Sequence, residues 1–315
     1  MIMRRTVVIP LVFCSILSPL LAASHALLID GPSRDGEDWT RESGPIKSIL
    51  ESTGLFQIES VTASGEFQPR FERYKLIVLN FGGDGWPLAT LTALDKYLQA
   101  GGGMVALPGA GSAFPDSPAF NLMLGLTAAH NRDRQAGPFW FYKDGNVAYD
   151  STTEGAAGKI VRVDQPFPIT IRDTEHPVTK GLPLVWMHLP DDVAGRLRGP
   201  GKNMSLLATA FSDAKNGGTG LDEPQIVAVT YGRGRVFRAI LGRTPESLEC
   251  AGLQTMLQRG AEWAATGKVT QRLPSDFPTE EKESRRGNRS AQSAAKDRRP
   301  PVPEPRPRAA VNSLQ

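Results

Sequence analysis

Apolar and polar positions in the first 110 residues alternate in blocks. Short, wholly apolar runs at 76–79 and 104–107 are separated by a segment, 88–99, with apolar residues at helical spacing. Such runs are typical of strands buried on both faces, and strands that alternate with helices predict a parallel sheet covered on both sides. The predicted strands here are 27–30, 56–61, 76–79 and 104–107, and the predicted helices are 45–51 and 88–99.

The pattern changes after residue 138. Apolar runs there become shorter, and Gly232-Arg233-Gly234 marks a hairpin turn. A final amphipathic pattern over 245–265 predicts a closing helix. The predicted strands of this half are 139–142, 159–163, 167–171, 205–210, 225–230 and 235–241. We therefore predict an α/β fold with a mostly parallel central sheet, helices on both faces and extra short strands in the C-terminal half.

Residues 1–26 have the pattern of a signal peptide. Two arginines precede an apolar segment over 7–22, and Ser24 and Ala26 put small side chains at the positions that a signal peptidase reads. A transmembrane anchor is the alternative, but the segment is short and two prolines interrupt it. We expect cleavage, a periplasmic or secreted protein, and no membrane span in the mature chain.

The C-terminal residues 273–315 differ in composition from the rest. They are rich in proline, arginine, glutamate and serine and have almost no large apolar side chains after Phe277, which predicts a disordered tail. The globular domain is then 27–272. Its only cysteine is Cys250, which we expect in the core rather than in a disulfide.

The net charge of +3 comes from the two ends of the chain. Because the part between them has no basic excess, nucleic acid is not an expected partner.

Several segments, in this order, resemble the ThuA-like family, which is named for trehalose utilisation. They are 80–87, 101–105, 113–116, 172–183, 196–200, 231–237 and 254–267. The resemblance implies a flavodoxin-like fold of the class I glutamine amidotransferase-like kind. It also implies a role in carbohydrate metabolism, in which family members bind or act on disaccharides and their keto derivatives.

The chain departs from that family where its members often carry histidines. Glu37, Pro108, Arg238 and Arg243 occupy those positions, and only His188 matches. Imidazole ligates metals and shuttles protons, whereas arginine stays protonated and only donates hydrogen bonds. We therefore expect no metal and no cofactor. Arginine does suit the recognition of carboxylate, phosphate or hydroxyl groups.

Glutamine amidotransferase chemistry is excluded by the turn after the strand over 104–107. That reaction needs a cysteine nucleophile at such a turn, and residues 107–110 read Leu-Pro-Gly-Ala.

Substrate-binding residues are expected in the loops that follow the strands, because ligands of parallel sheets bind outside the carboxyl ends. The glycine-rich loop over 80–87 is the clearest example. Indole rings could stack on sugar rings there, although buried indoles are often core residues. The candidate substrate-binding residues are Trp39, Asn80, Asp84, Trp86, Ser112, Arg238 and Arg243.

Four other side chains could transfer protons if the protein is an enzyme: Glu37, Asp38, His188 and Glu223. A helix cap for Asp38 and a structural role for His188 are the alternatives. We expect an exported protein that binds or processes a sugar or keto-sugar. The alternative is a non-catalytic binding or interaction module on the same fold, and the sequence leaves homo-oligomerisation open.

Overall fold

The computed structural model describes residues 23–31, 39–129 and 132–287. Its centre is a mixed sheet of 12 strands, in which nine follow the order β2-β1-β3-β4-β14-β13-β12-β8-β9. The first five of these are parallel, and they run in the order of a flavodoxin-like sheet. They are β1 (Ser24–Asp30), β2 (Phe56–Thr62), β3 (Leu76–Asn80), β4 (Gly103–Ala106) and β14 (Gly234–Ala239).

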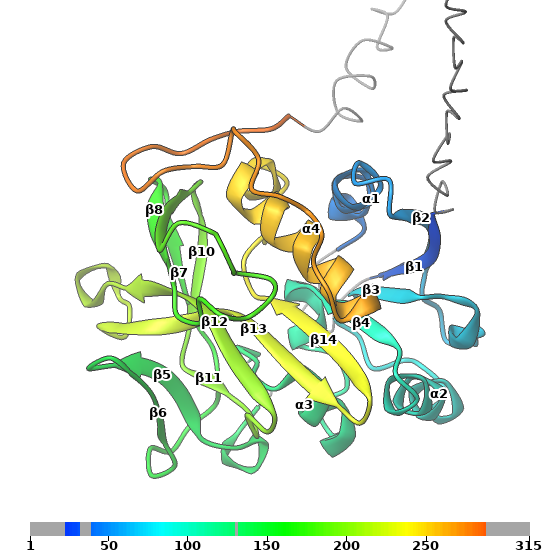
Figure 1. Cartoon of the computed structure of the whole chain (residues 1–315). Helices are drawn as coiled ribbons and strands as arrows, with labels where there is room; N and C mark the ends of the chain where they lie inside the picture. The colour runs from blue at the N-terminus through cyan, green and yellow to red at the C-terminus, as the bar shows by residue number, and fades with distance from the viewer. Residues whose placement is uncertain (1–22, 32–38, 130–131, 288–315) are drawn as a thin grey trace, which may run out of the picture.

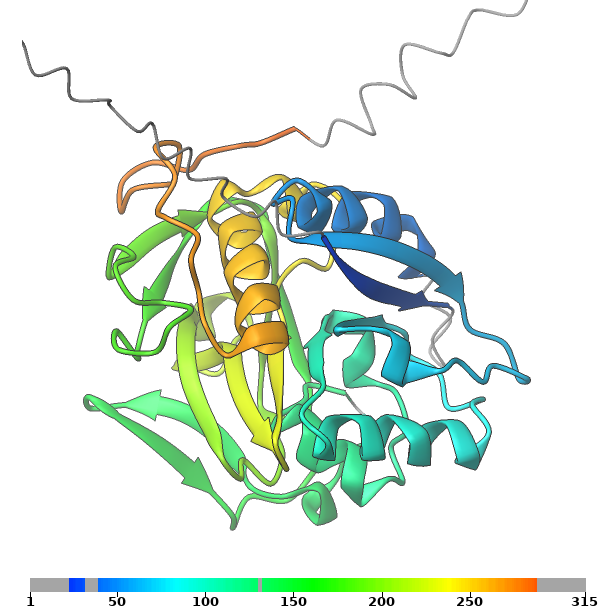
Figure 2. The ribbon, with the colours of Figure 1, turned by 45° about the vertical axis from the view of Figure 1, so that its right-hand side comes forward.

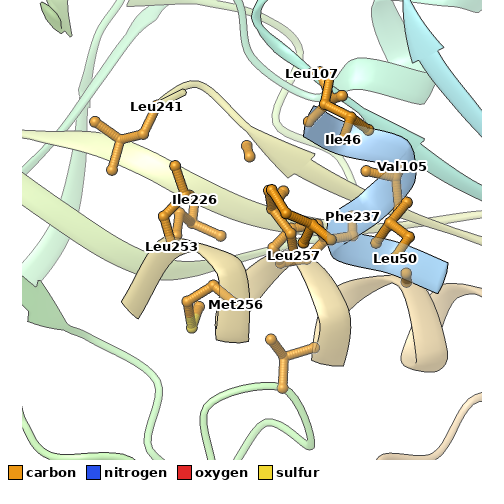
Figure 3. Close-up of a cluster of buried hydrophobic side chains, with 14 of the residues drawn as sticks. Ile46, Leu50, Val105, Leu107, Ile226, Phe237, Leu241, Leu253, Met256 and Leu257 are labelled. Atoms are coloured by element: carbon orange, nitrogen blue, oxygen red, sulfur yellow. The ribbon is translucent and has the colours of Figure 1, made fainter. Parts of the chain in front are cut away.

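Helices cover both faces of this parallel half, as predicted. α1 (Ser43–Glu51) and α4 (Ala251–Thr266) lie on one face, and α2 (Leu88–Gln99) and α3 (Pro118–Leu124) lie on the other (Figure 2). Side chains of β4 and β14 alternate between the two hydrophobic clusters. Val105 and Phe237 point towards α1 and α4 (Figure 3), whereas Met104 and Val236 join the cluster of α2 and α3.

The second half of the sheet is antiparallel. β14 pairs with β13 (Leu221–Tyr231), and β12 (Met204–Ser212), β8 (Phe167–Ile171) and β9 (Val185–His188) continue outward. The hairpin turn at Gly232 forms as predicted, with a φ of +58°.

Five strands lie off this path. β5 (Phe139–Lys143) pairs with β6 (Asn146–Asp150) and β11 (Leu197–Arg198), and β7 (Lys159–Val163) pairs with β10 (Asp191–Gly195) in a separate two-stranded ribbon (Figure 1). The pattern did not predict α3 or four of the strands: β6, β9, β10 and β11.

The first strand begins earlier than predicted. β1 starts at Ser24, whose N–H donates to Leu55 O at 2.8 Å, and residues 24–26 pair with β2. Cleavage after Ala26 would therefore remove three residues of this strand. Residues 1–22 of the predicted signal peptide lie outside the described residues. Within the described chain, no helix has the length and apolarity to cross a bilayer.

The predicted tail begins too early at residue 273. Residues 274–287, orange in Figure 1, pack along α4 and β9. Phe277 is buried against Trp186, Ala251 N–H donates to Ser284 O at 2.9 Å, and Arg286 pairs with Asp276. One apolar anchor and a few backbone bonds are thus enough to order a segment of polar composition. Residues 288–315 lie outside the described part.

Candidate functional site

A pocket of about 280 Å³ opens where β4 and β14 end, at the carboxyl edge of the parallel sheet. Four of the predicted substrate-binding residues line it together: Trp39, Ser112, Arg238 and Arg243. The other lining residues are Pro108, Gly111, Ala128, Ala129, Ile160, Asp192 and Ile240. We call this the strand-end pocket.

Asn80 supports the strand-end pocket from behind. It ends β3, and its Nδ2 donates to Trp39 O at 3.0 Å, which holds Trp39 beside the carboxyl ends of the strands. The Oδ1 atom of Asn80 is buried and has no hydrogen-bond partner. Asn80 thus positions Trp39 and does not itself line the pocket.

Arg238 is the central charged group of the pocket. It lies on β14 with 1% of its surface exposed, and its Nη1 donates to Leu107 O. Gly111 leaves room for it, because a Cβ there would lie 2.9 Å from Nη2. The Nε of Arg238 has no hydrogen-bond partner. Burial, and then the charges of Arg243 and Arg132, lower its pKa to about 9.

Arg243 lies beside Trp39, with its guanidinium carbon 5.4 Å from the ring centroid. The Nε of Arg243 is 3.4 Å from Asp192 Oδ2. The other oxygen of this carboxylate, Oδ1, is 3.6 Å from Arg162 Nη1. Asp192 is the only carboxylate among the described residues that line the pocket, and two guanidinium groups share it.

His188 does not line the strand-end pocket, which corrects its predicted place in the site. It is fully buried on β9, and its Nε2 lies 3.1 Å from Asp191 Oδ2. Burial disfavours the imidazolium, but Cys250 and Asp191 favour it more strongly, and the pKa of His188 rises to about 9. His188 is then protonated near neutral pH, which suits an ion pair rather than a general base.

Glu223 lines a different pocket, of about 320 Å³, together with Trp140, Lys159, Arg196 and Thr219. It is 2% exposed and its Oε2 has no partner. Burial raises its pKa to about 7, against the opposing effects of Arg196 and Thr219.

The two pockets lie on opposite faces of the β7–β10 ribbon. Ile160 lines the strand-end pocket and its neighbour Lys159 lines the Glu223 pocket, as consecutive strand residues do. Glu223 therefore lies in a different pocket from Arg238 and Arg243.

Trp86 belongs to the core, which corrects the prediction from its loop. It is 7% exposed and packs against Phe67, Phe81 and Phe114, with ring centroids 5.0–5.3 Å apart. Asp84 in the same loop is exposed, and neither residue lines the strand-end pocket. Glu37 and Asp38 lie outside the described residues.

Sequence reasoning missed the pocket residues that the β7–β10 ribbon and residues 128–129 supply. Asp192 follows His188 closely in the chain, and that short spacing was the only available hint. Within the described ranges, no three His, Cys, Asp or Glu side chains gather as metal ligands.

Comparisons with known proteins agree with this architecture. A family model described as "Trehalose utilisation", ThuA, matches residues 33–264. No curated protein sequence matches the chain. A ThuA-like protein from Parabacteroides merdae is 38% identical, with a TM-score of 0.77 over 84% of this chain and 98% of its own. A ThuA-like protein from Bacteroides uniformis is 17% identical, with a TM-score of 0.50 over 79% of this chain and 94% of its own, and shows likeness of fold alone.

Proposed function

Since the chain belongs to the ThuA family of trehalose utilisation, we propose that its strand-end pocket binds a sugar or keto-sugar. The chain would do so as an exported protein, on the strength of its signal-peptide pattern.

The size and position of the pocket support this proposal. Ligands of flavodoxin-like sheets bind at the carboxyl ends of the strands, and this pocket lies there. Its volume of about 280 Å³ is near the lower end of the usual range for small-molecule pockets, about 300–1,000 Å³. A single sugar unit is the size of ligand that suits it.

Two unsatisfied donors in the pocket wall carry the proposal. Arg238 Nε and Trp39 Nε1 are both buried without a hydrogen-bond partner. Leaving a buried donor unsatisfied costs about 1–3 kcal/mol, and more when the group is charged. A ligand rich in oxygen atoms would accept from both groups, and the indole offers an apolar edge to a sugar ring.

Binding without turnover is the form of the function that the pocket favours. Among the described lining residues, Asp192 is the only carboxylate, and its oxygens lie 3.6 Å from Arg162 Nη1 and 3.4 Å from Arg243 Nε. Neither His188 nor Glu223 reaches this pocket. Proton transfer would therefore depend on Glu37 or Asp38, which immediately precede Trp39 in the chain.

Isothermal titration of the purified protein with neutral, acidic and keto-sugars tests the proposal. Ala128→Phe should block the strand-end pocket and abolish binding, whereas Ala136→Phe, in a different pocket, should leave it intact. Product analysis after incubation with keto-disaccharides separates the two forms of the function. Equal binding by both variants, or no binding by the wild type, would contradict the proposal.

A further inference from the structure

Two other buried arginines among the described residues, Arg198 and Arg259, each donate to several carbonyl oxygens. Arg198 donates from Nε, Nη1 and Nη2 to the carbonyls of residues 155, 137 and 153 at 2.6–2.9 Å. Arg259 donates to four carbonyl oxygens, those of residues 177, 178, 180 and 271. Arg238 is similarly buried, but among the described residues it donates only to Leu107 O. The guanidinium of Arg238 therefore lacks the set of carbonyl partners that Arg198 and Arg259 have.

The surroundings of Arg238 are positive as well. Arg132 is also 1% exposed, donates from Nη2 to Ala113 O at 2.9 Å, and leaves Nε and Nη1 without partners. Arg132 and Arg243 both act against the charge of Arg238. Of the carboxylates that the structure describes nearby, Asp192 faces Arg243 and Arg162, and Asp116 favours the charge of Arg132. Among the described residues that line the strand-end pocket there are thus two arginines and one carboxylate.

We propose that the ligand of the strand-end pocket is a carboxylated sugar, such as a uronic or aldonic acid, whose carboxylate binds the Arg238 guanidinium. This inference rests on the proposed function and names its ligand class. The planar fork of a guanidinium matches a carboxylate and forms charge-assisted hydrogen bonds to it. A carboxylated sugar supplies the negative charge that the described residues around Arg238 do not provide.

A monoanion fits better than a sugar phosphate. Asp192 lies in the pocket wall, so a second negative charge on the ligand would be repelled. The buried guanidinium of Arg238, with Arg243 beside it, offers a carboxylate the two donors that it accepts from. A phosphate dianion needs more positive charge and more donors than these.

Titration of matched sugars tests this inference, for which we choose glucuronate against glucose and gluconate against glucitol. The purified wild-type protein should bind each acid about tenfold or more tightly than its neutral partner. Arg238→Met should abolish that preference by weakening the acids alone. Gly111→Ala, which displaces Nη2, should do the same to a smaller degree. Lys202→Met, which removes an exposed charge in another pocket, is the control and should change nothing.

The outcomes separate the inference from the proposed function. Equal affinity for acid and neutral sugars would contradict the carboxylated ligand and leave the proposal of sugar binding in place. Tighter binding of glucose 6-phosphate than of glucuronate would also overturn it, as would an unchanged acid affinity in Arg238→Met. If neither acid nor neutral sugars bind, the proposed function fails together with the inference.

Discussion

The imidazole of His188 and the carboxylate of Asp191 form a fully buried pair, with Nε2 and Oδ2 3.1 Å apart. The same carboxylate accepts the backbone N–H of Gly242 at 2.7 Å and of Arg243 at 3.3 Å. This pair therefore anchors the loop that carries Arg243 to the strand-end pocket. His188, the histidine that matches the family pattern, therefore bears on the pocket through Asp191, whose carboxylate holds the backbone of Arg243.

Replacing that histidine should destabilise the protein. His188→Gln leaves Asp191 buried without its cationic partner, which costs on the order of 3 kcal/mol. Because the folded-state pKa of about 9 lies above the ordinary 6.5, this stabilisation is complete below pH 6.5 and lost as the pH rises through 9. Denaturant unfolding between pH 6 and 10 should show that the difference in free energy of unfolding between wild type and variant shrinks as the pH rises. A difference independent of pH would contradict the ion pair.

Arg238 should contribute to binding at the expense of stability. Removing an unpaired buried charge is expected to leave the free energy of unfolding unchanged or to raise it by about 1–4 kcal/mol in Arg238→Met. Arg259→Met, a matched buried arginine with four carbonyl partners, should lose about 3 kcal/mol or more. Urea unfolding of the two variants measures both values. A strong loss of stability in Arg238→Met would mean that its guanidinium is satisfied.

Because of Glu223, the free energy of unfolding should decrease as the pH rises from 4.5 to 7. Its folded-state pKa of about 7 lies above the ordinary 4.5, so the folded protein holds the extra proton between these values. Stability decreases as the pH rises from 4.5 to 7, by up to about 3 kcal/mol. Glu223→Gln should be as stable as wild type at pH 4 and more stable at pH 8. Parallel stability curves for the two proteins would show an ordinary pKa.

The segment after α4 should contribute to folding. A chain that ends at residue 272 loses the Phe277 contact and the bonds between residues 251 and 284 and between 254 and 286, and should melt at a lower temperature. A chain that ends at 287 keeps all of these contacts and should melt like the full chain. Identical melting of all three chains would show that the segment adds nothing.

The apolar pattern predicted the regular elements well and the site only in part. α2, β7 and β8 form residue for residue as predicted, since their side chains alternate or repeat with burial. β9 and β10 were missed because short strands with Trp, His and Asp give no such pattern. The core position of Trp86 was missed because its partners Phe67 and Phe114 come from distant segments, and no local pattern shows that they pack together. Arg238 was a candidate binding residue because of the family resemblance, whereas its burial and its missing partners follow only from the packed structure.

The location of the sugar is tested most directly by a matched pair of tryptophan variants. Trp39→Phe removes one of the unsatisfied donors of the strand-end pocket, and Trp140→Phe alters the Glu223 pocket by removing a donor that is bonded to Gly199 O. Dissociation constants for the tightest sugar, measured by calorimetry, should rise several-fold in Trp39→Phe and stay unchanged in Trp140→Phe. An unchanged constant in Trp39→Phe, with weaker binding in Trp140→Phe, would contradict the account and place the ligand beside Glu223.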